Sequence, residues 1–218
     1  MRFVAVLPSV FVCQCLFAES SEKVYWQENF SRFEIGPAGG FGEKCVIKEE
    51  NGKKFLHGTG WMMGKMEYFG ARNWSDYSFR FRFRFTDPKK VGFYPLVKSR
   101  GKREHVKYLW YYVRLNRDGL GFSCHGVPKD QADRFKTPAF KFSDSALKPV
   151  EAGLWYSAEI QVTFNRIKVL FSKADESMKL IADIETAPGD GGVDILSYNP
   201  VDIAEMIVQK LPDRIDSK

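Results

Sequence analysis

Tyr77-Ser78-Phe79-Arg80-Phe81-Arg82-Phe83-Arg84-Phe85 alternates ring-bearing and polar residues along one stretch of the chain. Successive side chains of a β-strand point to opposite faces of the sheet, so this alternation predicts a strand with one aromatic and one cationic face. A register slip of one residue would bury arginines, which fixes the orientation of the strand. We therefore expect Phe79, Phe81, Phe83 and Phe85 in the core, and Arg80, Arg82 and Arg84 on the opposite face.

The rest of the chain repeats this strand-and-turn pattern. Asn51-Gly52, Asn116-Arg117-Asp118-Gly119 and Phe164-Asn165-Arg166 each separate two short apolar runs and predict hairpins. No amphipathic stretch predicts a helix longer than two turns. The pattern indicates an antiparallel all-β sandwich or barrel and not alternating βαβ units. Strands are expected at 24–30, 45–47, 55–57, 77–85, 91–97, 108–115, 120–124, 155–163, 167–171, 179–185, 193–197 and 204–211.

The N-terminus has the pattern of a secretory signal peptide. Arg2 supplies a positive start, an apolar run follows from Phe3 to Phe17, and Ala18 precedes a polar stretch. The apolar run is too short for a membrane-spanning helix. We expect a signal peptide at 1–18, one β-sandwich at 19–211 and a polar tail at 212–218, and hence a secreted or periplasmic protein.

The charge balance is mildly basic. The formal net charge is +6 over 218 residues, and the leader contributes only Arg2, which leaves +5. This excess is typical of a lysine-rich soluble surface, and it also suits attraction to a polyanion such as an acidic polysaccharide. Nucleic acid is disfavoured as a partner because the excess is modest and the protein is expected to be exported.

Two cysteines remain once the leader is removed. Cys45 and Cys124 are candidates for one disulfide, as expected in an exported chain, and two buried reduced thiols are the alternative. A zinc site is disfavoured because the chain has no CxxC motif and no paired histidine spacing.

Two further strands are sorted by the same alternation. In 108–115, Leu109, Tyr111, Val113 and Leu115 form the expected core face, and in 155–163 the residues Tyr156, Ala158, Ile160 and Val162 do so. Polar and aromatic residues occupy the other positions. If these strands share one sheet with 77–85, its open face carries Arg80, Arg82, Arg84, Tyr108, Trp110, Tyr112, Arg114, Glu159 and Gln161.

Such a surface suits a glycan. Flat rings stack on the apolar faces of sugars, and arginine forks bind carboxylate or sulfate groups through paired hydrogen bonds. The alternative is structural, since arginine opposite glutamate and aromatic cross-strand pairs also stabilise antiparallel sheets.

Seven segments of the chain share the pattern of one family of β-sandwiches. They are Arg72 to Tyr77, Val91-Gly92-Phe93, Tyr112 to Leu115, Gly153-Leu154-Trp155-Tyr156, Asn165 to Val169, Gly191 to Ile195 and Ala204 to Val208. Together they resemble the concanavalin A-like lectin/glucanase superfamily, within it laminin-G-like and 3-keto-disaccharide hydrolase-type domains. The resemblance implies an antiparallel jelly-roll β-sandwich for nearly all of the mature chain. The same fold hosts lectins, glycosidases, lyases and adhesion modules.

The chain departs from the enzymes of this superfamily. It has neither the ExDxxE pattern of laminarinase-type glycosidases nor the Gln-x-His motif of jelly-roll alginate lyases. The resemblance implies a structural calcium ion, with Asp190 and Asp194 or Asp76 as oxygen ligands, and a plain turn is the alternative. No other cofactor is expected.

The first functional hypothesis is a secreted carbohydrate-binding protein, with an acidic polysaccharide as one candidate ligand. The alternative is a glycoside hydrolase or polysaccharide lyase that uses the same groove, with Glu159, Tyr112 and His125 as the catalytic candidates. A structural or protein-binding module is the third hypothesis. No stable membrane span is expected.

Overall fold

The computed structural model describes residues 23–38, 41–42, 44–58, 62–63, 74–87, 93–100, 109–116, 119–125, 140–141, 150–173, 176–186, 188–197 and 199–212. For β5, β7 to β10 and two positions of β14, 194 and 196, the description covers the backbone. The expected leader at 1–18, Tyr108 and the tail beyond Pro212 lie outside the described residues.

All strand pairs that the structure describes are antiparallel, and the strands form two sheets. The nine-stranded sheet has the order β13-β12-β11-β6-β15-β4-β3-β2, and β1 also pairs with β15. Its strands are β1 (Val24–Glu28), β2 (Gly36–Pro37), β3 (Cys45–Glu50), β4 (Lys53–Gly58), β6 (Tyr77–Phe85), β11 (Tyr156–Thr163), β12 (Arg166–Lys173), β13 (Lys179–Glu185) and β15 (Val201–Lys210).

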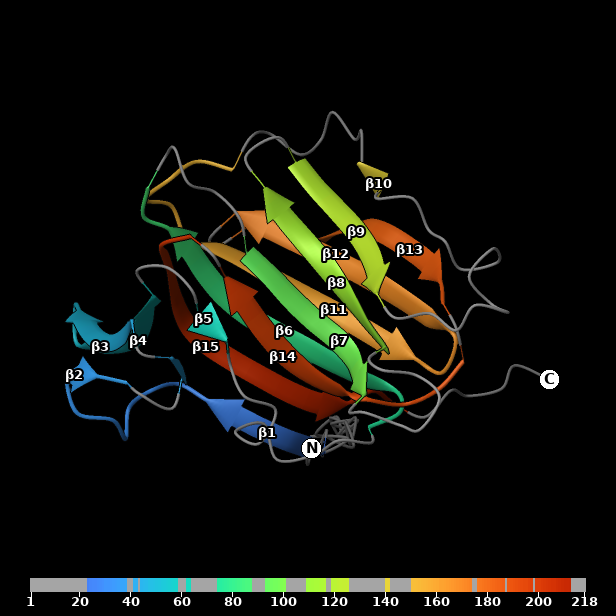
Figure 1. Cartoon of the computed structure of the whole chain (residues 1–218), viewed down its shortest axis with the longest axis horizontal. Coiled ribbons are helices and arrows are strands. Elements are labelled where there is room, and N and C mark those ends of the chain that lie inside the picture. The colour runs from blue at the N-terminus through green and yellow to red at the C-terminus, as the bar shows by residue number, and fades with distance from the viewer. Residues whose placement is uncertain are drawn as a thin grey trace, which may run out of the picture.

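The second sheet has six strands in the order β10-β9-β8-β7-β14-β5. In Figure 1, β7, β8, β9 and β14 lie in front of the long strands of the nine-stranded sheet. Its strands are β5 (Met62–Met63), β7 (Phe93–Arg100), β8 (Leu109–Asn116), β9 (Gly119–His125), β10 (Phe140–Lys141) and β14 (Gly192–Ser197).

The core lies between the two sheets, as the alternation in β6 predicted. Phe79, Phe81, Phe83 and Phe85 are at most 1% exposed and join one hydrophobic cluster with Val193 and Ile195 of β14. Burying a phenylalanine side chain stabilises the fold by roughly 1.5–3 kcal/mol, so this row of rings is a main source of stability. The predicted antiparallel β-sandwich is confirmed.

The hairpin between β3 and β4 also forms where the sequence predicted it. Asn51 and Gly52 have φ values of +52° and +72°. Two consecutive positive φ values characterise the type I′ turn, whose twist matches that of the flanking strands.

β15 begins at Val201, three residues before the predicted start at 204. A β-bulge lies between Ile203 and Glu205, where the register against β6 shifts by one residue. The bulge lets Val201 and Ile203 share the buried face with Met206 and Val208, although the first pair has odd numbers and the second pair even numbers. A strict alternation read from the sequence ends at this point.

Cys45 is a free thiol in this structure, so the expected disulfide with Cys124 is not formed. The Cys45 side chain is buried and donates a hydrogen bond to the Phe41 carbonyl oxygen at 3.3 Å. Cys124 lies on β9 in the other sheet. Burial raises the pKa of the Cys45 thiol to about 11. The alternative of a buried reduced thiol therefore holds for Cys45.

Among the described residues, no helix is long and apolar enough to cross a membrane.

Candidate functional site

The outer face of the nine-stranded sheet, which points away from the six-stranded sheet, carries the arginines of β6. Arg80 lies directly opposite Glu159 of β11 and donates to its carboxylate from Nε at 3.1 Å and from Nη2 at 2.8 Å. Gln161 donates its amide to the other oxygen of Glu159 at 2.9 Å. The structure thus brings Arg80, Glu159 and Gln161 together as predicted, and it ties them to one another.

Arg84 belongs to a larger ion-pair network on the same face. Asp202 of β15 is 2% exposed and accepts from Arg84 at 2.7 Å, while its other oxygen lies 2.6 Å from His57 Nδ1. Arg84 also donates to Glu50 at 2.9 Å. A carboxylate this deeply buried requires such partners, because an unpaired buried charge is strongly destabilising. This part of the predicted arginine row therefore has a structural role.

Aromatic rings border this network. The Arg84 guanidinium lies 4.6 Å from the ring centre of Trp155 and 5.4 Å from that of Phe55. Arg82 lies 5.9 Å from the Trp155 ring centre. These are cation–π distances. Within the described part of the chain Arg82 forms no ion pair, which distinguishes it from Arg80 and Arg84.

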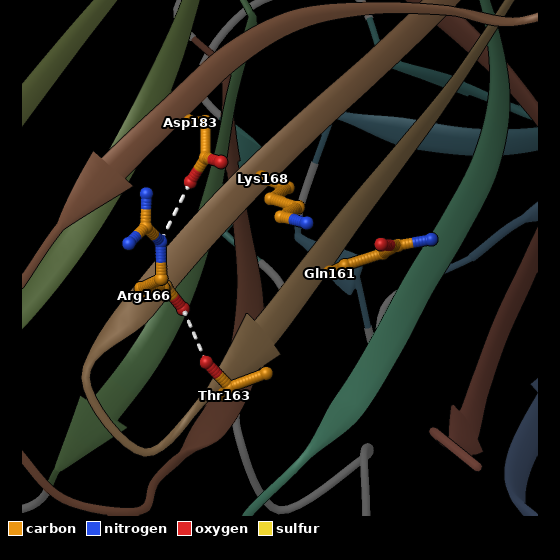
Figure 2. A pocket seen from close by; sticks show the side chains of 5 residues that line it. All are labelled: Gln161, Thr163, Arg166, Lys168 and Asp183. Atoms are coloured by element: carbon orange, nitrogen blue, oxygen red, sulfur yellow. Dashed lines mark hydrogen bonds and ion pairs between the residues drawn. The ribbon is translucent and has the colours of Figure 1, made fainter. Parts of the chain in front are cut away.

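A pocket of about 470 Å³ lies on the outer face of β11, β12 and β13. Figure 2 shows its lining side chains, which come from the two strands of a hairpin and the edge strand beside it. The pocket carries an amide, a hydroxyl, a guanidinium, an ammonium and a carboxylate. These groups belong to Gln161, Thr163, Arg166, Lys168 and Asp183.

Arg166 is held by Asp183. The Arg166 Nε donates to the Asp183 carboxylate at 2.9 Å, and Thr163 donates its hydroxyl to the Arg166 carbonyl oxygen at 3.5 Å. The hydrogen bond to Asp183 and the negative charge of that carboxylate raise the pKa of the Arg166 guanidinium. The Asp183 carboxylate therefore holds the Arg166 guanidinium in place, as the dashed line between the two side chains shows (Figure 2).

Lys168 is the pocket cation without an ionic partner among the residues that the structure describes. Its Cα lies directly opposite Gln161 on one side and Asp183 on the other. Asp183 bonds Arg166 instead, and Lys168 forms no ion pair with any residue that the structure describes. The ammonium of the half-buried residue Lys168 is therefore available to an external anion.

Of these five pocket residues, the sequence predicts only Gln161 as a site residue. Thr163, Arg166, Lys168 and Asp183 alternate with buried residues along β11, β12 and β13, so the period-two pattern marks them as outward positions. The hairpin predicted at Phe164-Asn165-Arg166 makes β11 and β12 neighbours, but no sequence feature shows that β13 pairs with β12 in the register that builds the pocket.

The predicted single open face is wrong, because β8 lies in the other sheet. Trp110, Tyr112 and Arg114 of β8 belong to the six-stranded sheet, whereas Arg82 belongs to the nine-stranded sheet. In a sandwich the outer faces of the two sheets point in opposite directions. Trp110 and Arg82 therefore do not line one common groove.

The backbone register still groups the β8 positions. Trp110 lies opposite His125, and Tyr112 lies opposite Ser123 of β9. Tyr112 also lies opposite Leu96 of β7, which in turn lies opposite Asp194 of β14. Residues that lie directly opposite each other occupy positions on the same face of a sheet. These β8 positions therefore share one face with the position of Asp194, and the buried Ile195 occupies the other face. The three catalytic candidates are thus split, with Tyr112 and His125 in one sheet and Glu159 in the other.

Comparison with solved structures identifies the architecture. A GH16 protein of the Bacteroides ovatus mixed linkage glucan PUL, in complex with its G4G4G3G product, matches with a TM-score of 0.57 and 9% identity over 85% of this chain and 100% of that one. The carbohydrate binding module CBM66 from Bacillus subtilis matches with a TM-score of 0.50 and 10% identity over 76% and 92% of the two chains. The chain has the concanavalin A-like jelly-roll fold.

The concanavalin A-like architecture is shared without detectable sequence similarity. A xylan β-1,4-xylosidase from Bacillus halodurans matches with a TM-score of 0.51 and 7% identity over 84% of this chain and 39% of that one. No family model matches the sequence, and no curated protein is significantly similar to it. At these identities the likeness establishes the fold, and the site must be argued from its residues.

The calcium ion implied by the concanavalin A-like resemblance stays a prediction. No group of three or more His, Cys, Asp or Glu side chains able to hold a metal ion occurs among the described residues. Asp76, the third candidate, accepts a hydrogen bond from the Phe164 backbone N–H at 3.3 Å. Asp190 is half-buried and lies just before β14. For Asp194 the structure describes the backbone alone.

Proposed function

We propose that the protein is a secreted carbohydrate-binding protein that holds an acidic polysaccharide in the pocket of β11, β12 and β13. The observation that carries the proposal is Lys168, a half-buried lysine that lacks an ionic partner among the described residues. Arg166, beside it, is oriented by Asp183. A carboxylate or sulfate on a sugar would accept hydrogen bonds from both cations.

The remaining pocket groups suit sugar hydroxyls. Gln161 commits its amide N–H to Glu159, which leaves the carbonyl oxygen as an acceptor. The second oxygen of Asp183 and the hydroxyl of Thr163 add polar contacts. Wet polar sites of this kind bind hydroxyl-rich ligands through direct and water-mediated hydrogen bonds.

The fold neighbours support a glycan ligand. One is a carbohydrate binding module, and another is in complex with an oligosaccharide product. We infer a similar class of ligand for this chain, and the acidic character of that ligand is inferred from Lys168 and Arg166.

The hydrogen-bonded ion pairs of the carboxylates on this face favour binding without catalysis. Glu159 is held by Arg80 and Gln161, and Asp183 is held by Arg166. A glycoside hydrolase needs one carboxylic acid and one carboxylate on either side of the scissile bond. Glu159 and Asp183 are both committed to partners within the sheet, so neither carboxylate is free to act on a scissile bond.

Calorimetric titration with hexagalacturonate and with the neutral cellohexaose tests the proposal. We expect hexagalacturonate to bind and Lys168→Ala to weaken its binding by roughly tenfold, as expected for loss of a charged hydrogen bond worth about 1.5 kcal/mol. The matched control is Lys53→Ala, which removes an exposed lysine at the start of β4. Equal binding of cellohexaose, or an unchanged affinity of the Lys168 variant, would contradict the proposal.

A further inference from the structure

A second cation that has no ionic partner within the described ranges lies on the same outer face. Arg82 of β6 forms no ion pair with a described residue, and its guanidinium lies 5.9 Å from the Trp155 ring centre. Trp155 directly precedes β11 and is half-buried. Its ring packs edge-on against Phe55, with ring centres 6.0 Å apart. A flat ring beside a guanidinium offers both a stacking surface for a sugar and a fork for its acidic group.

Lys168 and Arg82, the two cations that lack a described ionic partner, lie on either side of β11. Lys168 lies opposite Gln161, whereas Arg82 lies opposite Ser157, four residues earlier along the same strand. Four residues of strand and two strand spacings separate their Cα atoms by roughly 16 Å. Arg80 and Glu159 lie between these positions as a closed ion pair. The face therefore carries available positive charge at two separate points.

We propose that Arg82 and Trp155 form a second subsite, and that the ligand is an acidic glycan chain long enough to reach from this subsite to Lys168. This inference rests on the proposed function and adds a requirement for chain length. Each subsite alone gives weak binding, and a chain that occupies both gains affinity because the second contact is intramolecular.

The charges around the second subsite agree with an extended ligand. Glu205 of β15 is the residue directly opposite Arg82, and it forms no ion pair with a described residue. Its carboxylate lowers the local positive potential, so Arg82 is unsuited to capture a small anion by charge alone. A chain anchored at Lys168 delivers its acidic group to Arg82 at high effective concentration.

The test measures the affinity of digalacturonate and of hexagalacturonate for wild type and Arg82→Gln. We expect wild type to bind hexagalacturonate at least tenfold more tightly than digalacturonate. Arg82→Gln should lower the hexagalacturonate affinity by roughly fivefold or more and change the digalacturonate affinity by less than twofold. Trp155→Phe, which keeps a ring beside Phe55, is the second variant. Like Arg82→Gln, it should lower the hexagalacturonate affinity more than the digalacturonate affinity.

The outcomes separate the two proposals. Equal losses for both lengths, or no loss for either, would overturn the second subsite while leaving the pocket intact. Failure of wild type to bind either galacturonate would overturn the proposed function itself. The affinity of a single-stranded oligothymidylate is measured as well. Binding as tight as that of hexagalacturonate, with the same dependence on Arg82, would overturn the assignment to a glycan.

Discussion

Lys168 lies directly opposite Asp183 in the register of β12 and β13, yet Asp183 bonds Arg166, two residues away along β12, at 2.9 Å. The diagonal pair satisfies the carboxylate and leaves the lysine of the direct pair without an ionic partner among the described residues. A diagonal ion pair can in this way leave one cation of a sheet surface available at a defined place.

Glu205→Gln should tighten the binding of hexagalacturonate. The carboxylate lies across from Arg82 and opposes the approach of an acidic chain. Exposed charge pairs contribute about 0.2–1 kcal/mol, so we expect a gain of up to roughly fivefold. Titration at low and at high salt checks this, since the gain should shrink as salt screens the charges. A loss of affinity would show that Glu205 contacts the ligand.

Asp202→Asn should destabilise the fold. The carboxylate is 2% exposed and joins Arg84 of β6 to His57 of β4. Removing one partner of a buried ion pair leaves the other uncompensated, and we expect a loss of about 3 kcal/mol in the free energy of unfolding. Urea denaturation measures it. Asp183→Asn at the half-exposed pair with Arg166 is the control, expected to cost less than about 1 kcal/mol.

Cys45 should make the fold less stable in mild alkali. Its thiol keeps its proton in the folded protein up to a pKa of about 11, whereas the unfolded thiol has its ordinary pKa near 9.0. The folded state therefore binds more protons between these values, and stability falls as the pH rises from about 9 to about 11. Cys45→Ala should lose this slope in urea denaturation at each pH. A slope that persists unchanged in the variant would assign it to other groups.

Trp110→Ala should leave the affinity for hexagalacturonate within twofold of wild type. Trp110 lies on β8 in the six-stranded sheet, whereas the pocket lies on the outer face of the nine-stranded sheet. A comparison with Lys168→Ala in the same titration decides between the two faces. A tenfold loss in the Trp110 variant alone would move the binding surface to β8 and β9.

Expression with secretion should yield a mature chain that starts at Glu19. The apolar run from Phe3 to Phe17 followed by Ala18 has the pattern of a cleaved leader. N-terminal sequencing of the exported protein checks the cut. Retention of Met1 in the exported protein would contradict it.

Local patterns in the sequence predicted the strands well. The alternation in β6 and β11 correctly assigned the buried face, and Asn51-Gly52 correctly marked a hairpin. The sheet to which each strand belongs was not predictable in this way, because period two sorts side chains within a strand and contains no information on neighbouring strands. This is why Trp110 was grouped with Arg82, although their strands lie in different sheets.

The pocket was missed for a related reason. Arg166 and Lys168 occupy outward positions in the sequence pattern, but Asp183 of the neighbouring edge strand β13 determines which of the two cations stays available, and its register against β12 is not specified by alternation. The buried pair of His57 and Asp202 joins strands separated by most of the chain. Such pairs depend on long-range register, which turn chemistry and alternation do not specify.

The bulge in β15 has a consequence for how the chain can change in length. Ala204 is the extra residue between Ile203 and Glu205. Its removal would leave a strand in which Val201, Ile203, Met206 and Val208 still occupy one face. Removal of Ile207 would instead turn the side chains on one side of the deletion to the opposite face of the sheet. Homologous chains that differ by one residue within this central strand are therefore expected to differ at position 204.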